Sequence, residues 1–212
     1  MHSLRRFRHD RSSALLTARN EDELAAVLRA APSHVVGVGG GSSVLDVGGV
    51  PVFAKRIPIT DREVAHPHST ANLFDLPTCC QYGMYGLAGP SFGAWRELVA
   101  NMIVTEGVLA GEAESFPLLY HWRVLPGRAP IASEQLDIDA VVAQFGGAPA
   151  VHIRLEELAA ATSSLVLFLE YVPYPLLDRL TDPVGQAETL ERQLFFSGGL
   201  SRIHLAAGSG ST

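Results

Sequence analysis

A run of glycines between two segments rich in valine limits the fold of this chain more than any other feature. The glycines lie between Val35 and Val44, and a second turn at Gly48-Gly49 leads into the apolar segment Val52–Ala54. Apolar residues alternate on both sides, which predicts a β-hairpin whose second half returns antiparallel to the first strand. Glycine lets backbone N–H groups approach phosphate oxygens closely. The stretch therefore predicts a hairpin whose tip is either a flexible turn or a nucleotide-binding loop.

Length and composition fit one or two globular domains. The 212 residues are 47% hydrophobic and 18% charged, which is enough to bury a core. The mean hydropathy is +0.18, yet no uninterrupted apolar run approaches the length of a membrane span. The net charge of −6 gives no nucleic-acid-binding footprint. We expect a cytoplasmic protein without a membrane or nucleic-acid partner.

The first 34 residues read as an arm followed by a helix. Arginines gather at Arg5, Arg6, Arg8 and Arg11, and no apolar signal segment follows them. We expect a solvated arm, with contact to an anionic partner as the alternative. Behind it, residues 20–30 predict a capped amphipathic helix that packs behind the sheet as an N-terminal extension.

Residues 61–90 read as a long connection with little periodicity. It holds His66, His68 and the adjacent Cys79 and Cys80. Adjacent cysteines suit neither an ordinary disulfide nor a C-x-x-C pair. A zinc site and a covering loop are the two interpretations of this segment.

Later segments alternate between helical and extended patterns. A helix is predicted from Phe92 to about Leu109 with Ser91 as its cap. Aromatic and β-branched residues from Phe116 to Leu125 predict a strand. The further predicted elements are two helices, Asp137 to Phe145 and Ala150 to Ala161, and a last strand, Leu165 to Val172.

The order of these features resembles the N-lobe of the protein kinase superfamily, with the bacterial serine/threonine protein kinases as the nearest type. The family pattern G-x-G-x-x-G-x-V is matched by Gly37, Gly39, Ser42 and Val44, with serine in place of the third glycine. Gly40 and Gly41 beside that serine supply the same backbone freedom. The resemblance implies an α+β fold in residues 35–172, with an antiparallel sheet and the family's helix C.

The resemblance also implies a site for ATP. Lys55 would pair with the α and β phosphates, and Glu97 in the helix would hold its ammonium. Leu169 would line the pocket, while the backbone of Glu170 and Val172 would bind the adenine edge. Other glutamates that could pair with Lys55 are Glu112, Glu114, Glu156 and Glu157.

The chain departs from the family in two places. Residues of about 127–163 form a helical insertion where the family has a short turn, and residues 173–212 read as a hinge exit, a partial C-lobe and a Gly/Ser tail. No aspartate follows Asp182 and no asparagine follows Asn101, so the family's acceptor base and magnesium ligands cannot be assigned. We expect the 212 residues alone to be inactive, through natural truncation or a frameshift. We also expect apolar surface at Leu169–Leu180 and on the insertion to be exposed and to favour self-association.

Four functions remain open at this point. The first is an ATP-dependent protein kinase of unknown acceptor, and the second a small-molecule kinase of the same fold. The third is a non-catalytic, pseudokinase-like regulatory or binding module. The fourth, a dinucleotide-binding fold, requires a helix directly after the glycines, where this sequence predicts a strand.

Overall fold

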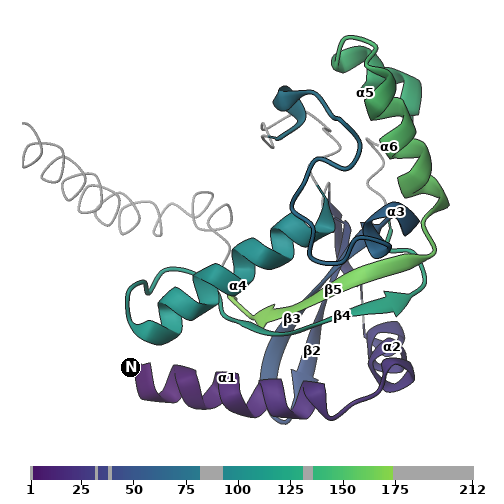
Figure 1. Ribbon diagram of the computed structural model, residues 1–212. Helices are drawn as coiled ribbons and strands as arrows, with labels where there is room; N and C mark the ends of the chain where they lie inside the picture. Colours follow the sequence, from purple (N-terminus) through teal and green to yellow (C-terminus); the bar gives the residue numbers. More distant parts are fainter. Residues whose placement is uncertain (1, 32, 38–39, 82–92, 131–135, 174–212) are drawn as a thin grey trace, which may run out of the picture. The chain divides into compact units, whose positions relative to one another are not determined.

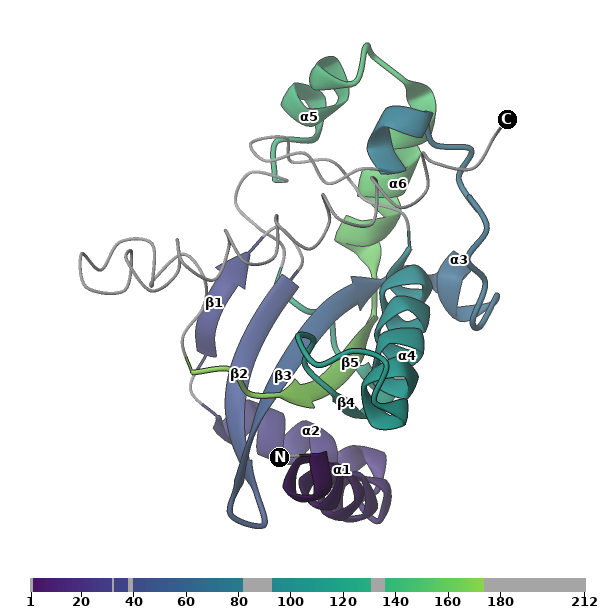
Figure 2. The ribbon, with the colours of Figure 1, turned by 90° about the vertical axis from the view of Figure 1, so that its left-hand side faces the viewer.

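The computed structural model describes residues 2–31, 33–37, 40–81, 93–130 and 136–173, and these form an α+β structure (Figures 1 and 2). In chain order the elements are α1 (His2–Thr17), α2 (Glu21–Ala30), β1 (Ser33–Gly37), β2 (Gly40–Val47), β3 (Val50–Ile59), α3 (Asp61–Val64), η1 (Thr78–Gln81), α4 (Ala94–Ala110), β4 (Leu119–Pro126), α5 (Ile138–Gln144), α6 (Pro149–Ala160) and β5 (Ser163–Glu170). The chain divides into two units, residues 1–171 and 172–212. Residues 1–34, predicted as a separate arm and helix, belong to the same unit as the sheet.

The sheet has five antiparallel strands in the order β1-β2-β3-β5-β4. The glycine segment forms the predicted hairpin, in which Gly37 opposes Gly40 and Val36 opposes Gly41. A second tight turn joins β2 to β3, where both Gly48 and Gly49 adopt positive φ. Glycine is favoured there because the turn requires a left-handed backbone at both positions.

Strand β5 is buried on both faces, and this divides the core into two layers. Leu165, Leu167 and Leu169 pack with Trp95 and Leu98 of α4. The alternate residues of β5, Val166 and Phe168, pack instead with leucines of α1 and α2. Because successive side chains of a strand point to opposite faces, α4 covers one face of the sheet, while α1 and α2 cover the other (Figure 1).

The arginine-rich start of the chain is a helix that packs on the sheet, so the expectation of a solvated arm is wrong. Leu16 of α1 is fully buried, and Ser13 Oγ donates a hydrogen bond to the carbonyl oxygen of Tyr120 in β4 at 2.6 Å. The guanidinium of Arg5 holds the carboxylate of Glu170, with Nε at 2.9 Å from Oε1. The prediction was wrong because it relied on the overall charge of this segment. The contacts of α1 with the sheet come from one face of the helix only.

Most other helix predictions are confirmed. Helix α2 begins with a complete capping box, in which Asn20 and Glu23 each accept from the other's backbone N–H at 2.9 Å. The two helices of the insertion are present as α5 and α6, and α4 extends close to its predicted bounds.

Most apolar residues of the helical insertion are packed, contrary to expectation, and only Leu136 and Ile153 among its large described apolar side chains are exposed. Residues from α5 and α6 pack against the connection that follows α3, in a third core cluster of Phe74, Leu76, Cys80, Val141, Val151, Leu155 and Leu158. Leu169 is also buried. Val172 is exposed as expected, and residues 174–180 of the surface expected to self-associate lie outside the described residues.

Within the described residues, no helix combines the length and the apolar character that crossing a membrane requires.

The packing of α1 can be tested with two adjacent leucines of one helix. Leu16 is 0% exposed and Leu15 is 39% exposed. We expect Leu16→Ala to lower the free energy of unfolding by about 2–5 kcal/mol, because it leaves a cavity against the sheet. Leu15→Ala is expected to change it by no more than about 1 kcal/mol. Urea denaturation of the full chain measures both, and equal effects would mean that α1 does not pack as described.

Candidate functional site

The strand register places most of the predicted site residues on one face of the sheet. Ser42 of β2 opposes Lys55 of β3, and Val44 opposes Phe53. Lys55 and Phe53 in turn oppose Leu167 and Leu169 of β5. Residues directly opposite one another in an antiparallel sheet point to the same side. Since the leucines pack against α4, Ser42, Val44, Lys55 and Leu169 all lie on the α4 face.

Lys55 and Glu97 meet on this face. Lys55 Nζ donates to Glu97 Oε1 at 2.5 Å, and the two side chains are 29% and 34% exposed. The ammonium has three donors, so this contact leaves it able to bind a further anionic group. Partial exposure gives such a group access from solvent.

The other candidate glutamates lie elsewhere. Glu156 faces His152 at 3.3 Å, and Glu157 pairs with Arg62 at 2.5 Å. Glu112 and Glu114 follow the end of α4, a helix whose first turn contains Glu97. Of the five glutamates considered, Glu97 is therefore the one that the structure brings to Lys55.

Lys55 is the only lysine among the 212 residues, whereas the chain has 15 arginines. A single lysine among many arginines is a sequence signal that a comparison with known motifs does not consider. An ammonium is a compact point charge that suits phosphate contact without the fixed fork of a guanidinium. Position 55 is distinctive because it holds lysine, whereas the other 15 lysine or arginine residues of the chain are all arginine.

The glycine segment has a packing role that the sequence does not reveal. Gly40 has φ +108, and a Cβ at this position would lie 1.9 Å from the carbonyl oxygen of Arg56. Only glycine fits there, because any side chain would collide with the backbone of β3. Gly37 ends β1 and Gly41 lies in β2, whereas Gly39 lies outside the described residues. The requirement for glycine at position 40 thus comes from the sheet itself, whatever the loop binds.

The predicted hinge residues are only partly available to a ligand. The Glu170 N–H donates to the carbonyl oxygen of Leu118 at 2.7 Å. The Glu170 carboxylate accepts from Arg5 and from the Leu118 N–H. The N–H and the carboxylate of Glu170 are therefore already hydrogen-bonded within the protein. The predicted contact with adenine requires the backbone C=O of this residue. Val172 belongs to the second unit and is exposed.

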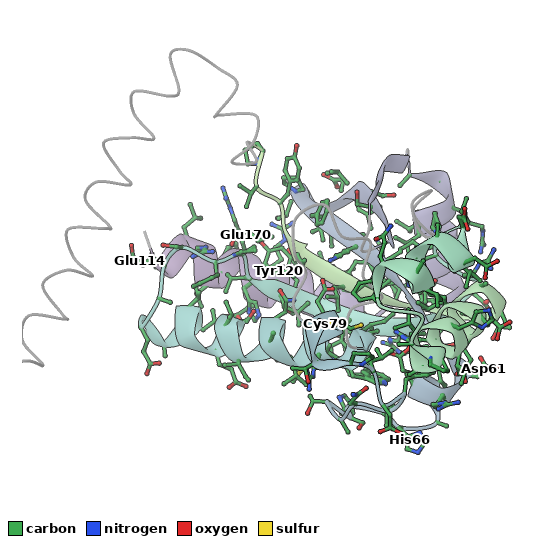
Figure 3. All side chains as sticks on the ribbon, turned by 90° about the horizontal axis from the view of Figure 1, so that it is seen from above. Asp61, His66, Cys79, Glu114, Tyr120 and Glu170 are labelled. Carbon is green, nitrogen blue, oxygen red and sulfur yellow. The ribbon has the colours of Figure 1, made fainter. Side chains whose placement is uncertain are left out.

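Tyr120 neighbours Glu170 on the α1 side of the sheet (Figure 3). Burial, together with the charge of Glu170, raises the pKa of the Tyr120 phenol to about 12. The hydrogen bond to Glu170 raises the pKa of Arg5. These shifts keep the Tyr120 phenol neutral and the Arg5 guanidinium charged at neutral pH.

Sequence reasoning missed a buried carboxylate that determines where α4 begins. Glu63 Oε2 accepts from the backbone N–H and the hydroxyl of Thr60, each at 2.9 Å. Arg154 of α6 donates to both carboxylate oxygens, at 2.8 and 3.1 Å. The N–H of Ala94, the first residue of α4, donates to Oε1 at 2.9 Å. Trp95 Nε1 donates to the Glu63 carbonyl oxygen at 2.7 Å.

We call Thr60, Glu63, Ala94, Trp95 and Arg154 the Glu63 network. It replaces the N-cap that Ser91 was predicted to supply. Ser91 lies outside the described residues, and the N-cap of α4 is Gly93, which makes no side-chain hydrogen bond. A Cβ on Gly93 would lie 2.8 Å from Glu63 Oε1, so glycine leaves room for the carboxylate to reach the helix. A carboxylate at a helix N-terminus satisfies an N–H that has no partner within the helix.

Trp95, a member of this network, packs against Trp122, the other tryptophan of the chain. The rings of Trp95 and Trp122 are perpendicular, with centroids 5.8 Å apart, and His68 lies 5.0 and 5.2 Å from them. His68 has φ 61, a conformation that is uncommon for a residue with a side chain. The fluorescence of the two tryptophans should therefore change when the first turn of α4 moves.

The residues considered for a zinc site have other surroundings. His66 Nδ1 lies 2.8 Å from the carbonyl oxygen of Arg62, and His68 packs on the tryptophans. Cys79 is exposed and Cys80 is buried, with its thiol pKa raised to about 11 by burial and by Cys79. Among the described residues, no three histidine, cysteine, aspartate or glutamate side chains form a group that could hold a metal ion.

The contribution of the Glu63 network to stability can be measured against a matched arginine. Arg154 and Arg62 both lie over the ring of Phe74, at 4.8 and 4.4 Å, and each pairs with a glutamate. The side chain of Arg154 is 4% exposed and that of Arg62 is 40% exposed. We expect Arg154→Ala to cost about 3–5 kcal/mol, because it leaves the buried carboxyl group of Glu63 without its partner.

The control, Arg62→Ala, is expected to cost no more than about 1 kcal/mol, because its ion pair is solvated. Urea denaturation followed by circular dichroism distinguishes the two variants. Equal losses would contradict the assignment of Glu63 as a buried, structurally central carboxylate.

Comparison with the sequence patterns of known protein families, with curated proteins and with solved structures finds no match to this chain.

Proposed function

We propose that the sheet and α4 form the ATP-binding region of a phosphotransferase that resembles the N-lobe of the protein kinase superfamily, with a serine/threonine protein kinase as the leading type. The observation that carries this proposal is the ion pair between Lys55 and Glu97 on the face shared with Ser42, Val44 and Leu169. An ammonium held by a carboxylate beside a glycine hairpin suits the phosphates of a nucleotide. Apolar residues farther along the same face suit the adenine.

In this proposal each group has a separate task. Lys55 contacts phosphate oxygens, and Glu97 keeps the ammonium directed toward them. Val44 and Leu169 supply apolar surface to the base, and the backbone C=O of Glu170 supplies a polar contact to its edge. The backbone of residues 37–42 approaches the phosphates. All these tasks concern binding and orientation.

The residues present do not fit the magnesium site of the proposed family. The described residues contain no suitable group of three ligands, and the sequence has no aspartate after Asp182. We therefore assign no step through a metal ion. Phosphoryl transfer also needs a group that accepts the proton of the acceptor hydroxyl, and none is assigned here. We propose nucleotide binding as the activity of these 212 residues on their own.

A pseudokinase-like regulatory module is the second candidate. The same observation favours it, because a Lys55–Glu97 pair without assigned catalytic aspartates supports binding but not transfer. The acceptor class, protein or small molecule, is left open by both candidates.

The proposal predicts that nucleotide affinity depends on Lys55 and not on its neighbour. Lys55→Met removes one charge-assisted contact, worth about 1.5–3 kcal/mol, and should weaken binding of a non-hydrolysable ATP analogue about 10- to 100-fold. Arg56→Met is the control, since Arg56 follows Lys55 on β3 and points to the other face. Glu97→Gln should weaken binding less than Lys55→Met, because the glutamate acts only through the lysine.

Isothermal titration calorimetry gives the dissociation constants, with Glu106→Gln as the control on the exposed side of α4. Equal affinity in wild type and Lys55→Met would remove the assigned site. Binding of NAD in preference to the ATP analogue would favour a dinucleotide-binding protein instead.

A further inference from the structure

We propose that the helical insertion controls the Lys55–Glu97 pair, with Arg154 and Glu63 as positioning residues for the nucleotide site. This inference rests on the proposed function. It gives α6 a role in the site, whereas the resemblance to kinases implies no role for this helix.

Glu97 moves with the first turn of α4. Glu97 lies three residues after Ala94, within the first turn of a continuous helix. Glu63 holds this turn twice, through the Ala94 N–H and through the indole of Trp95. A movement of that turn carries the Glu97 carboxylate with it. The distance between Glu97 and Lys55 therefore depends on where Glu63 lies.

The carboxylate of Glu63 is in turn held by α6. This carboxylate is buried, and Arg154 grips both oxygens from α6. A planar guanidinium that binds both oxygens fixes the orientation of a carboxylate as well as its position. Thr60 fixes the other side through its N–H and hydroxyl. A displacement of α6 is thus transmitted to the start of α4.

The helical insertion has a core of its own. Val151, Leu155 and Leu158 of α6 are buried in the third core cluster, apart from the two clusters that pack on the sheet. The described polar contacts that link α6 to α3 are the buried pair of Arg154 with Glu63 and the solvated pair of Glu157 with Arg62. Rigid elements with separate cores, joined by a specific polar contact, are a physical basis for coupling between sites.

The test uses the single lysine of the chain. Protein labelled with ¹³C at lysine Cε should give one NMR signal, from Lys55, and Glu97→Gln defines the signal of the unpaired lysine. The double variant Glu63→Gln/Arg154→Met removes the buried charges together, a change that a fold usually tolerates. We expect its lysine signal to shift toward that of Glu97→Gln, with altered tryptophan emission. Arg62→Met should leave both readouts as in the wild type.

Nucleotide affinity provides the second measurement. The double variant should bind the ATP analogue about three- to tenfold more weakly than the wild type, while its urea midpoint remains close to that of the wild type. If the double variant does not fold, Arg154→Lys keeps the charge, loses the contact with both oxygens and should shift the lysine signal in the same direction.

Two failures are distinguishable. A folded variant with the wild-type lysine signal overturns the positioning role, even if Lys55→Met abolishes nucleotide binding. Absence of nucleotide binding in the wild type overturns the proposed function, while a shifted lysine signal in the variants still establishes that Arg154 positions Glu97.

Discussion

The buried carboxylate of Glu63 is the interaction on which the arrangement of the site depends. Moving a carboxylate out of water is costly unless charge and hydrogen bonds compensate for the lost hydration. Five donor contacts from Thr60, Ala94 and Arg154 do so here. They come from the end of β3, the start of α4 and the middle of α6. A single side chain thereby determines how three segments far apart in the sequence meet.

The rest of the candidate site follows from this junction and from the sheet. Strand β3 carries Lys55 on the α4 face, and α4 carries Glu97 to it. On the other face, α1 and α2 cover the sheet, and Arg5 holds Glu170 at the end of β5. Strand β5 is thus packed on both sides, which limits its freedom to shift and that of its neighbour β3. A lysine on such a sheet has a defined position before any ligand binds, and preorganisation of this kind favours affinity.

Local patterns were enough to predict most elements of the fold. Alternating valines and glycines predicted the hairpin, and helical periodicity predicted α2, α4, α5 and α6. The pair of Lys55 and Glu97 could be anticipated because the order of elements along the chain suggested it. Arg154 and Glu63 could not, since they are 91 residues apart and neither belongs to a recognisable motif. The same holds for Arg5 and Glu170, 165 residues apart, and so the arm was expected to be solvated.

Chemical labelling of the single lysine tests the central claim most directly. An acyl phosphate derivative of ATP places its acyl carbon at the phosphate end of the nucleotide. An amine bound there attacks this carbon, forms an amide and releases ATP. The account predicts that peptide mass spectrometry finds the acyl group on Lys55 and that excess ATP suppresses the labelling. Labelling no greater than that by an acyl phosphate without adenosine, or undiminished by ATP, would contradict a nucleotide site at Lys55.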